Sequence, residues 1–248
     1  MIDTETTPPP ASPKRLWGFW ATVGFSAAVF TIYFAAQTFV SLIVLIVKFY
    51  TSELTLYEAL KSLGTDGFAL SLATLVAVPL GLLLTIVFTR LRSGISVADY
   101  LGWKPISPKT FWRLVLLFIA MVATLLFLGS HLSGNDDTFS GELYRNGGFL
   151  PLLWLAIVFL APLFEEVFFR GFLFVGLRAS RLGAAATIVL TSLLWAAMHL
   201  QYNLSGIAQI FVVGIILGAL RHKTDSLWSP LLIHVLWNGM AMVFTALS

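Results

Sequence analysis

The sequence predicts an all-α, polytopic integral membrane protein. Of its 248 residues, 58% are apolar and only 11% are charged, whereas soluble domains carry about 25% charged residues. The apolar residues gather into seven stretches, each of the length that the hydrocarbon core of a bilayer requires. The absence of cysteine excludes disulfides, thiolate metal ligands and a cysteine nucleophile. A net charge of +3 is too small to indicate a nucleic-acid partner.

The apolar stretches define the expected elements in order. Residues 1–15 are rich in Pro and Thr and are expected to form a flexible tail. The 32 residues Leu16–Val47 contain no charge and are too long for a signal-peptide core, which predicts an uncleaved first span. A hairpin hidden in this stretch would raise the count from seven spans to eight. The other expected spans are Gly67–Thr89, Leu114–Leu132, Phe149–Leu177, Gly183–Leu200, Leu204–Leu220 and Ser226–Leu247.

Positive charges alternate between the two sets of connecting segments. One set carries 12 Lys and Arg residues, and the other carries 3 together with six acidic residues. Segments on the inner side of a membrane are enriched in Lys and Arg. The N-terminus is therefore expected inside and the C-terminus outside. The membrane would be the plasma membrane of a prokaryote or the endoplasmic reticulum of a eukaryote.

Polar side chains within the later spans mark a candidate site. An ionisable group at membrane depth costs roughly 2.5–3.5 kcal/mol and usually has a function or a partner. The residues concerned are Glu165, Glu166 and Arg170 in the fourth span, Trp195 and His199 in the fifth, and His234 and Asn238 in the seventh. At about 1.5 Å per residue, the three groups fall roughly 20, 24 and 16 Å from the inner ends of their spans. They can meet in one layer at or beyond the midplane, provided that the fourth span continues past Arg170.

Helical spacing predicts different roles for the two adjacent acids. Glu166 and Arg170 are four residues apart, so they share a helix face and can neutralise each other as a buried pair. Glu165 lies about 100° around the helix and is left without that partner. An unpaired carboxylate in a low dielectric is strongly basic when ionised, as a general base must be.

The same four-residue spacing recurs in the other two groups. Trp195 lies one turn below His199, and His234 and Asn238 direct a ring and an amide toward one point. Pro162, just before the acids, is expected to free a backbone carbonyl, which is tolerated only beside protein or a wet cavity. The sequence therefore predicts a polar intramembrane cavity formed by the later spans.

Other polar or small residues have simpler interpretations. Gly214 and Gly218 form a GxxxG pattern, which predicts a close helix contact. Arg221 and its polar neighbours up to Asp225 are expected in a solvated inner loop. His131 is interpreted as interfacial.

Three motifs together resemble the CPBP family of intramembrane proteases, which includes CAAX prenyl endopeptidases and Abi-type, bacteriocin-processing membrane proteins. The motifs are Glu-Glu-x-x-x-Arg at 165–170, aromatic-x-x-x-His at 195–199 and His-x-x-x-Asn at 234–238. Trp195 stands where the family usually has Phe, a change expected to affect cavity shape more than chemistry. The resemblance covers roughly residues 150–240, within a catalytic region expected at 149–248. Residues 16–148 are expected to be transmembrane helices without a recognised motif.

The resemblance implies an endopeptidase with its site inside the membrane. Its substrate would be a membrane-associated peptide or protein, either of the prenylated CAAX type or bearing a leader. By carry-over from the family motifs, Glu165 and His199 would activate the attacking water. His234 and Asn238 would stabilise the oxyanion.

The resemblance also implies supporting roles and leaves the metal requirement open. Glu166 would take part in catalysis with Arg170 by holding the helix face of Glu165, and Trp195 would support the site. Zn²⁺ held by Glu165, His199 and His234 is one option. The other, slightly preferred, is direct activation of water with no tightly bound metal.

Two alternatives from other classes stay open. A non-catalytic membrane scaffold or immunity-type binding protein would keep these residues as a structural polar core. A small-solute or proton carrier would use Glu165 and the histidines as a relay. The sequence shows no inverted repeat of the kind that many carriers have, which makes the carrier the weaker alternative.

Overall fold

The computed structural model describes residues 16–52, 55–131 and 138–248, with side chains left out at 128–131 and 138. Helices joined by short links make up this part of the chain, and no strand occurs in it. The expected flexible tail, residues 1–15, lies outside the described residues, and so does the side chain of His131. The predicted all-α, polytopic class is confirmed.

Six helices are long and apolar enough to cross a membrane, and a shorter apolar helix accompanies them. The long ones are α1 (Phe19–Thr51), α3 (Gly67–Arg90), α5 (Pro108–His131), the continuous run from α7 to α9 (Leu150–Arg178), α11 (Leu204–Thr224) and α12 (Trp228–Leu247). The shorter one is α10 (Gly183–Ala197). Because α1 is one unbroken helix, it excludes a hairpin in the first stretch, and the described residues hold seven apolar helices.

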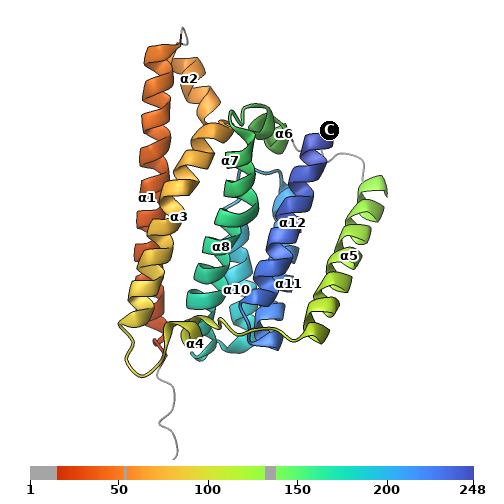
Figure 1. Cartoon of the computed structure of the whole chain (residues 1–248). Helices are drawn as coiled ribbons and strands as arrows, with labels where there is room; N and C mark the ends of the chain where they lie inside the picture. Colours follow the sequence, from red (N-terminus) through yellow and green to blue (C-terminus); the bar gives the residue numbers. More distant parts are fainter. Residues whose placement is uncertain (1–15, 53–54, 132–137) are drawn as a thin grey trace, which may run out of the picture.

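The seven helices run alternately up and down, so that the molecule has two distinct ends (Figure 1). The upper end carries the short helices α2 (Leu56–Leu63) and α6 (Thr138–Arg145) and the C-terminus. The lower end carries the short helix α4 (Val97–Leu101). The start of α1 and the end of α12 therefore lie at opposite ends.

Capping residues fix the turn from α1 through α2 to α3 at the upper end. Thr55 and Glu58 form a capping box, in which the Glu58 backbone N–H donates to Thr55 Oγ1 and the Thr55 N–H donates to Glu58 Oε2. Asp66 caps α3 by accepting from the Ala69 N–H at 3.0 Å, and its other oxygen pairs with Lys48. The first two spans are thereby held in register.

Small residues allow α10 and α11 to approach closely. A Cβ placed on Gly214 would lie 3.0 Å from Ser192 Cβ, and one on Gly218 would lie 3.1 Å from Ile188 Cγ2. The helix contact predicted from the GxxxG pattern is confirmed. It brings the end of α10, which carries the second motif, against α11.

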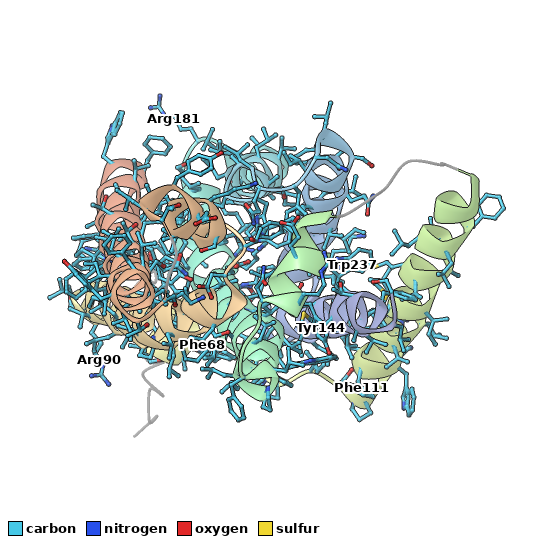
Figure 2. The ribbon with its side chains drawn as sticks, turned by 90° about the horizontal axis from the view of Figure 1, so that it is seen from above. Phe68, Arg90, Phe111, Tyr144, Arg181 and Trp237 are labelled. Atoms are coloured by element: carbon cyan, nitrogen blue, oxygen red, sulfur yellow. The ribbon has the colours of Figure 1, made fainter. Side chains whose placement is uncertain are left out.

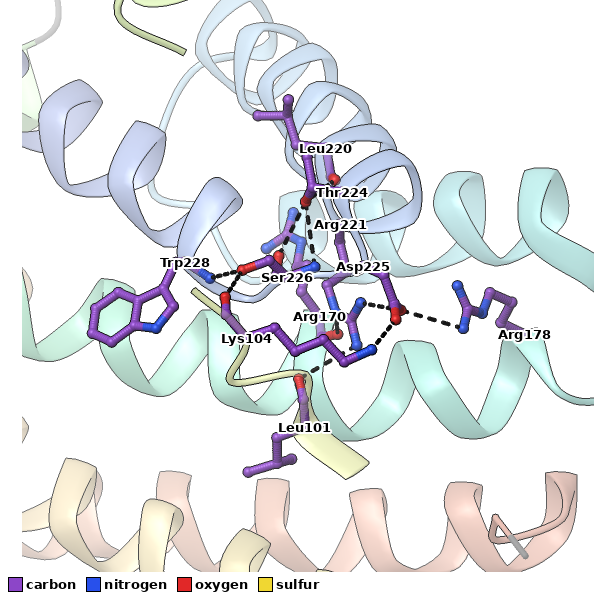
Figure 3. Close-up of polar contacts among 10 residues, drawn as sticks. All are labelled: Leu101, Lys104, Arg170, Arg178, Leu220, Arg221, Thr224, Asp225, Ser226 and Trp228. Atoms are coloured by element: carbon purple, nitrogen blue, oxygen red, sulfur yellow. Dashed lines mark hydrogen bonds and ion pairs between the residues drawn. The ribbon is translucent and has the colours of Figure 1, made fainter. Parts of the chain in front are cut away.

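A polar network ties the lower end together (Figure 3). Arg221 is almost fully buried, and its Nε donates to Arg170 O at 3.0 Å. Its two other nitrogens donate to Asp225 Oδ1 at 3.0 Å and to Leu101 O at 3.4 Å. The expectation of a solvated loop is wrong for Arg221, because its guanidinium satisfies buried carbonyls of the neighbouring segments.

Asp225 is the anionic centre of this network. It pairs with Lys104 and Arg221, and Arg178 lies 3.8 Å from it. Burial acts to raise the pKa of the Asp225 carboxyl, but the hydrogen bonds and charges of Lys104 and Arg221 outweigh it and hold that pKa below its usual value. The ionised carboxylate therefore joins the turn between α11 and α12 to the segment after α4.

Candidate active site

The helix that carries both acids is not a regular α-helix. It contains two π-helical segments, η1 (Leu155–Leu160) and η2 (Glu166–Leu173), separated by α8 (Ala161–Glu165) and followed by α9 (Phe174–Arg178). In a π-helix each N–H donates to the carbonyl five residues earlier, and such segments are frequent at functional sites. The helix continues past Arg170, which is the condition under which the three polar groups were expected to meet.

Pro162 and Asn238 explain how the first π-helical segment ends. The Ala161 N–H donates to Ala156 O, so the next N–H in this pattern would serve Ile157 O. Pro162 has no N–H, and Asn238 Nδ2 donates to Ile157 O instead, at 2.9 Å. The carbonyl predicted to be freed by Pro162 is present, and a side chain of α12 satisfies it.

Glu166 lies at the centre of a buried chain of charged and polar groups. Arg170 Nη1 donates to Glu166 Oε1 at 2.9 Å, and the two side chains are 0% exposed. His234 Nδ1 lies 2.8 Å from the same oxygen. The predicted Glu166–Arg170 pair is present, and the structure adds His234, whose ring orientation the pair fixes.

Glu165 faces the other way and is partly accessible. Its Oε2 accepts a hydrogen bond from Trp195 Nε1 at 2.5 Å and lies 3.8 Å from His234 Nε2. Glu165 therefore lacks the Arg170 partner, as predicted, but it has a neutral donor. Because Phe has no N–H to donate, Trp at this position adds a hydrogen bond to Glu165, and the expectation that the change from Phe affects shape more than chemistry stays a prediction.

Trp195 also joins the two histidines of the site. Its ring centroid lies 5.2 Å from that of His199 and 5.1 Å from that of His234. His199 Nδ1 lies 2.8 Å from the Trp195 carbonyl oxygen, so Nδ1 carries a proton. In the neutral ring, Nε2 is then the nitrogen that can accept one.

A cavity of about 560 Å³ brings most of these groups to a common surface. Five of the seven predicted site residues line it, namely Glu165, Trp195, His199, His234 and Asn238. Glu166 and Arg170 lie behind that surface, fully buried. Seen from the upper end, Tyr144 and Trp237, which also line the cavity, lie toward the middle of the molecule (Figure 2).

The first half of the chain contributes a wall that the sequence analysis missed. Tyr33 and Gln37 of α1 line the cavity, and Gln37 Nε2 donates to the Tyr33 hydroxyl at 3.1 Å. The Tyr33 ring stacks on Phe164, with 4.0 Å between centroids. The available signal was the four-residue spacing of two polar residues within an uncharged stretch.

The described residues do not form a ready metal site. Among them, no three His, Asp or Glu side chains are grouped so that they could hold a metal ion. Glu165, His199 and His234 share the cavity without converging on one point. The zinc option stays a prediction, and no step proposed below passes through a metal.

The fold and site define a polytopic membrane protein with a carboxylate–histidine site in an intramembrane cavity. Residues 147–240 match the model of a family described as type II CAAX prenyl endopeptidase Rce1-like. This match confirms the resemblance to CPBP and CAAX proteases that the three motifs carry.

A curated relative and the solved structures complete the comparison. A protein of Escherichia coli described as an uncharacterized 24.3 kDa protein is 32% identical over 141 residues. The match covers 54% of this chain and 63% of that protein, which is less than two thirds of its length. No solved structure matches the chain.

Proposed function

We propose that this protein is an intramembrane endopeptidase in which Glu165 is the general base. The observation that carries the proposal is the placement of Glu165. Its carboxylate lines a cavity large enough for a peptide segment and lies 3.8 Å from His234 Nε2. The family match at residues 147–240 supports protease activity.

Glu165 and His199 act on the attacking water. The Glu165 carboxylate takes a proton from water, and the hydroxide oxygen bonds to the scissile carbonyl carbon. The His199 Nε2 lone pair is a second acceptor for that water. When the C–N bond breaks, the proton passes from Glu165 to the leaving amine, so that the enzyme returns to its starting state. The N–H of Trp195 holds the carboxylate in one orientation throughout.

His234 and Asn238 stabilise the negative charge on the carbonyl oxygen. With Nδ1 held by Glu166, an imidazolium of His234 presents its Nε2–H to the cavity. Arg170 and Glu166 balance each other, so the imidazolium is compensated by the Glu165 carboxylate. One N–H of the Asn238 amide is used by Ile157 O, and its second N–H serves the oxyanion.

The distribution of charges supports a proposed orientation of the protein in the membrane. Nine Lys and Arg residues of the described chain lie at the lower end, namely Arg90, Arg92, Lys104, Lys109, Arg113, Arg178, Arg181, Arg221 and Lys223. Three lie at the upper end, namely Lys48, Lys61 and Arg145. We propose that the lower end, at which α1 begins, lies inside the cell.

Cleavage by Glu165 is testable in membranes. The parent protein and Glu165→Gln are expressed at matched abundance, and all new peptide termini are sequenced. New termini that occur only with the parent support proteolysis and identify the substrate. If both membranes show the same new termini, the proposed role of Glu165 is refuted. If neither membrane shows new termini in a cell that contains the physiological substrate, the result supports the non-catalytic scaffold instead.

A further inference from the structure

The cavity has its mouth at the upper end of the molecule. Its lining includes residues from each of the segments that form this end: Gly64 before α3, Ser140 of α6, Gln201 between α10 and α11, and Thr245 near the end of α12. Figure 1 shows these segments together at the upper end. A substrate would therefore reach the proposed catalytic groups from the upper end of the molecule.

The short helix α10 leaves irregular backbone at this end of the cavity. Its 15 residues span about 22 Å at 1.5 Å per residue, less than the roughly 30 Å of a bilayer core. Because α10 starts at the lower end, the link 198–203 lies within the depth of the membrane. Irregular backbone at that depth is tolerated only where it lines protein or water. Gln201 and Asn203, both exposed, line the cavity there.

The two ends of the molecule differ in charge. This difference indicates which end faces the inside of the cell, and so on which side of the membrane the mouth of the cavity lies. Nine Lys and Arg residues of the described chain lie at the lower end and three at the upper end. The lower end is therefore inside and the mouth of the cavity is outside.

The cavity wall also restricts the substrate. Of the described residues that line it, none is Lys or Arg, and the carboxylate present is Glu165. A peptide that ends in a free carboxylate near the scissile bond would place a second negative charge in a low dielectric without a cationic partner. An uncharged peptide segment has no such cost.

We infer that the cavity is served from the outer side of the membrane and cleaves an internal bond within an uncharged segment of an exported, membrane-anchored peptide. This inference rests on the proposed protease function and narrows its substrate class. Of the two substrate types left open, a leader-bearing peptide fits this cavity. A cytoplasmic protein cleaved close to its free C-terminal carboxylate does not.

The cysteine-free sequence permits a direct test of the side. Gln201→Cys places a thiol in the mouth of the cavity, and Ser93→Cys places one in the exposed turn at the lower end. A membrane-impermeant maleimide is added to intact cells and then to permeabilised cells. We expect Gln201→Cys to be labelled in intact cells and Ser93→Cys only after permeabilisation. The reverse pattern overturns the inference and leaves the proposed protease untouched.

The substrate class is tested with two reporters. Both carry the same uncharged segment next to a membrane anchor, one displayed outside and one inside, and each is expressed with the parent or with Glu165→Gln. We expect cleavage of the outer reporter by the parent alone, and loss of that cleavage when an Asp replaces a residue beside the cut bond. Cleavage of the inner reporter overturns the inference. If neither reporter is cleaved while the labelling is as expected, the proposed substrate class is overturned and the outward topology is retained.

Discussion

Two adjacent carboxylates of one helix have different environments. Glu166 is fully buried between Arg170 and His234, whereas Glu165 faces the cavity and accepts from Trp195. Burial with a cation holds the first acid as a structural charge. Access to the cavity leaves the second acid free to exchange a proton. Two adjacent positions thus have different roles: Glu166 orients His234, and Glu165 is the proposed reactive group.

Trp195→Phe tests the role of the indole N–H. We expect the protein to fold and insert, because the aromatic ring that contacts both histidines is largely retained. A hydrogen bond to a charged group contributes about 1.5–3 kcal/mol, so the cleavage rate is expected to fall by about 10- to 150-fold. The rate is measured on a substrate identified by terminus sequencing.

The matched control is Trp237→Phe, which changes another tryptophan of the cavity wall. This substitution is expected to leave the rate within a few-fold of the parent. Equal losses in both variants would show that ring size, rather than the hydrogen bond to Glu165, determines the effect.

At the scale of elements, the π-helical segments position the site. The first ends at a carbonyl capped by Asn238, and Arg221 donates to Arg170 O in the second. Helical spacing in the sequence was sufficient to predict the Glu166–Arg170 pair. It could not predict these segments, because a change from four-residue to five-residue hydrogen bonding leaves no pattern in the order of side chains. Arg221 was misplaced because two of its three partners are backbone carbonyls of distant segments, which the order of side chains does not reveal.

The link between Pro162 and Asn238 is testable by stability. Asn238→Leu leaves Ile157 O without its donor, at an expected cost of about 1–3 kcal/mol in unfolding free energy. In a Pro162→Ala background the backbone N–H is restored, so the same substitution is expected to cost less. Thermal unfolding in detergent, followed by tryptophan fluorescence, measures both. Strictly additive effects would contradict the coupling.

Asp225 makes the lower-end network sensitive to acid. Its pKa is lowered in the folded protein, so its stabilising effect is complete above its unfolded pKa of about 3.9 and is lost as the pH falls through the lower folded value. We expect the unfolding temperature of the parent to decrease when the pH is lowered below about 4.

Asp225→Asn is a suitable comparison, because Asn tolerates the left-handed backbone of this position, where φ is 48°. The Asp225→Asn variant is expected to have a lower unfolding temperature than the parent at neutral pH. Its unfolding temperature is expected to change less than that of the parent in this acidic range. The same acid response in both proteins would assign the effect to other carboxyl groups.

At the scale of the whole molecule, the two halves of the chain build one site. The later spans supply the reactive groups, as the motifs predicted, and α1 supplies the wall formed by Tyr33 and Gln37. Apolar length was enough to predict the seven apolar helices, six of them long enough to cross a membrane, because it depends on local composition. Which early helix faces the cavity depends on packing between distant segments, such as Tyr33 against Phe164, and this could not be predicted from spacing alone.

The most direct test of the central claim is hydrolysis in ¹⁸O-labelled water. The substrate found by terminus sequencing is incubated with the parent, with Glu165→Gln and with Glu142→Gln, an exposed acid on α6 that is outside the cavity lining. Mass spectrometry of the new C-terminus is expected to show ¹⁸O incorporation with the parent and with Glu142→Gln, and no product with Glu165→Gln. Labelled product formed at the parental rate by Glu165→Gln would contradict the account.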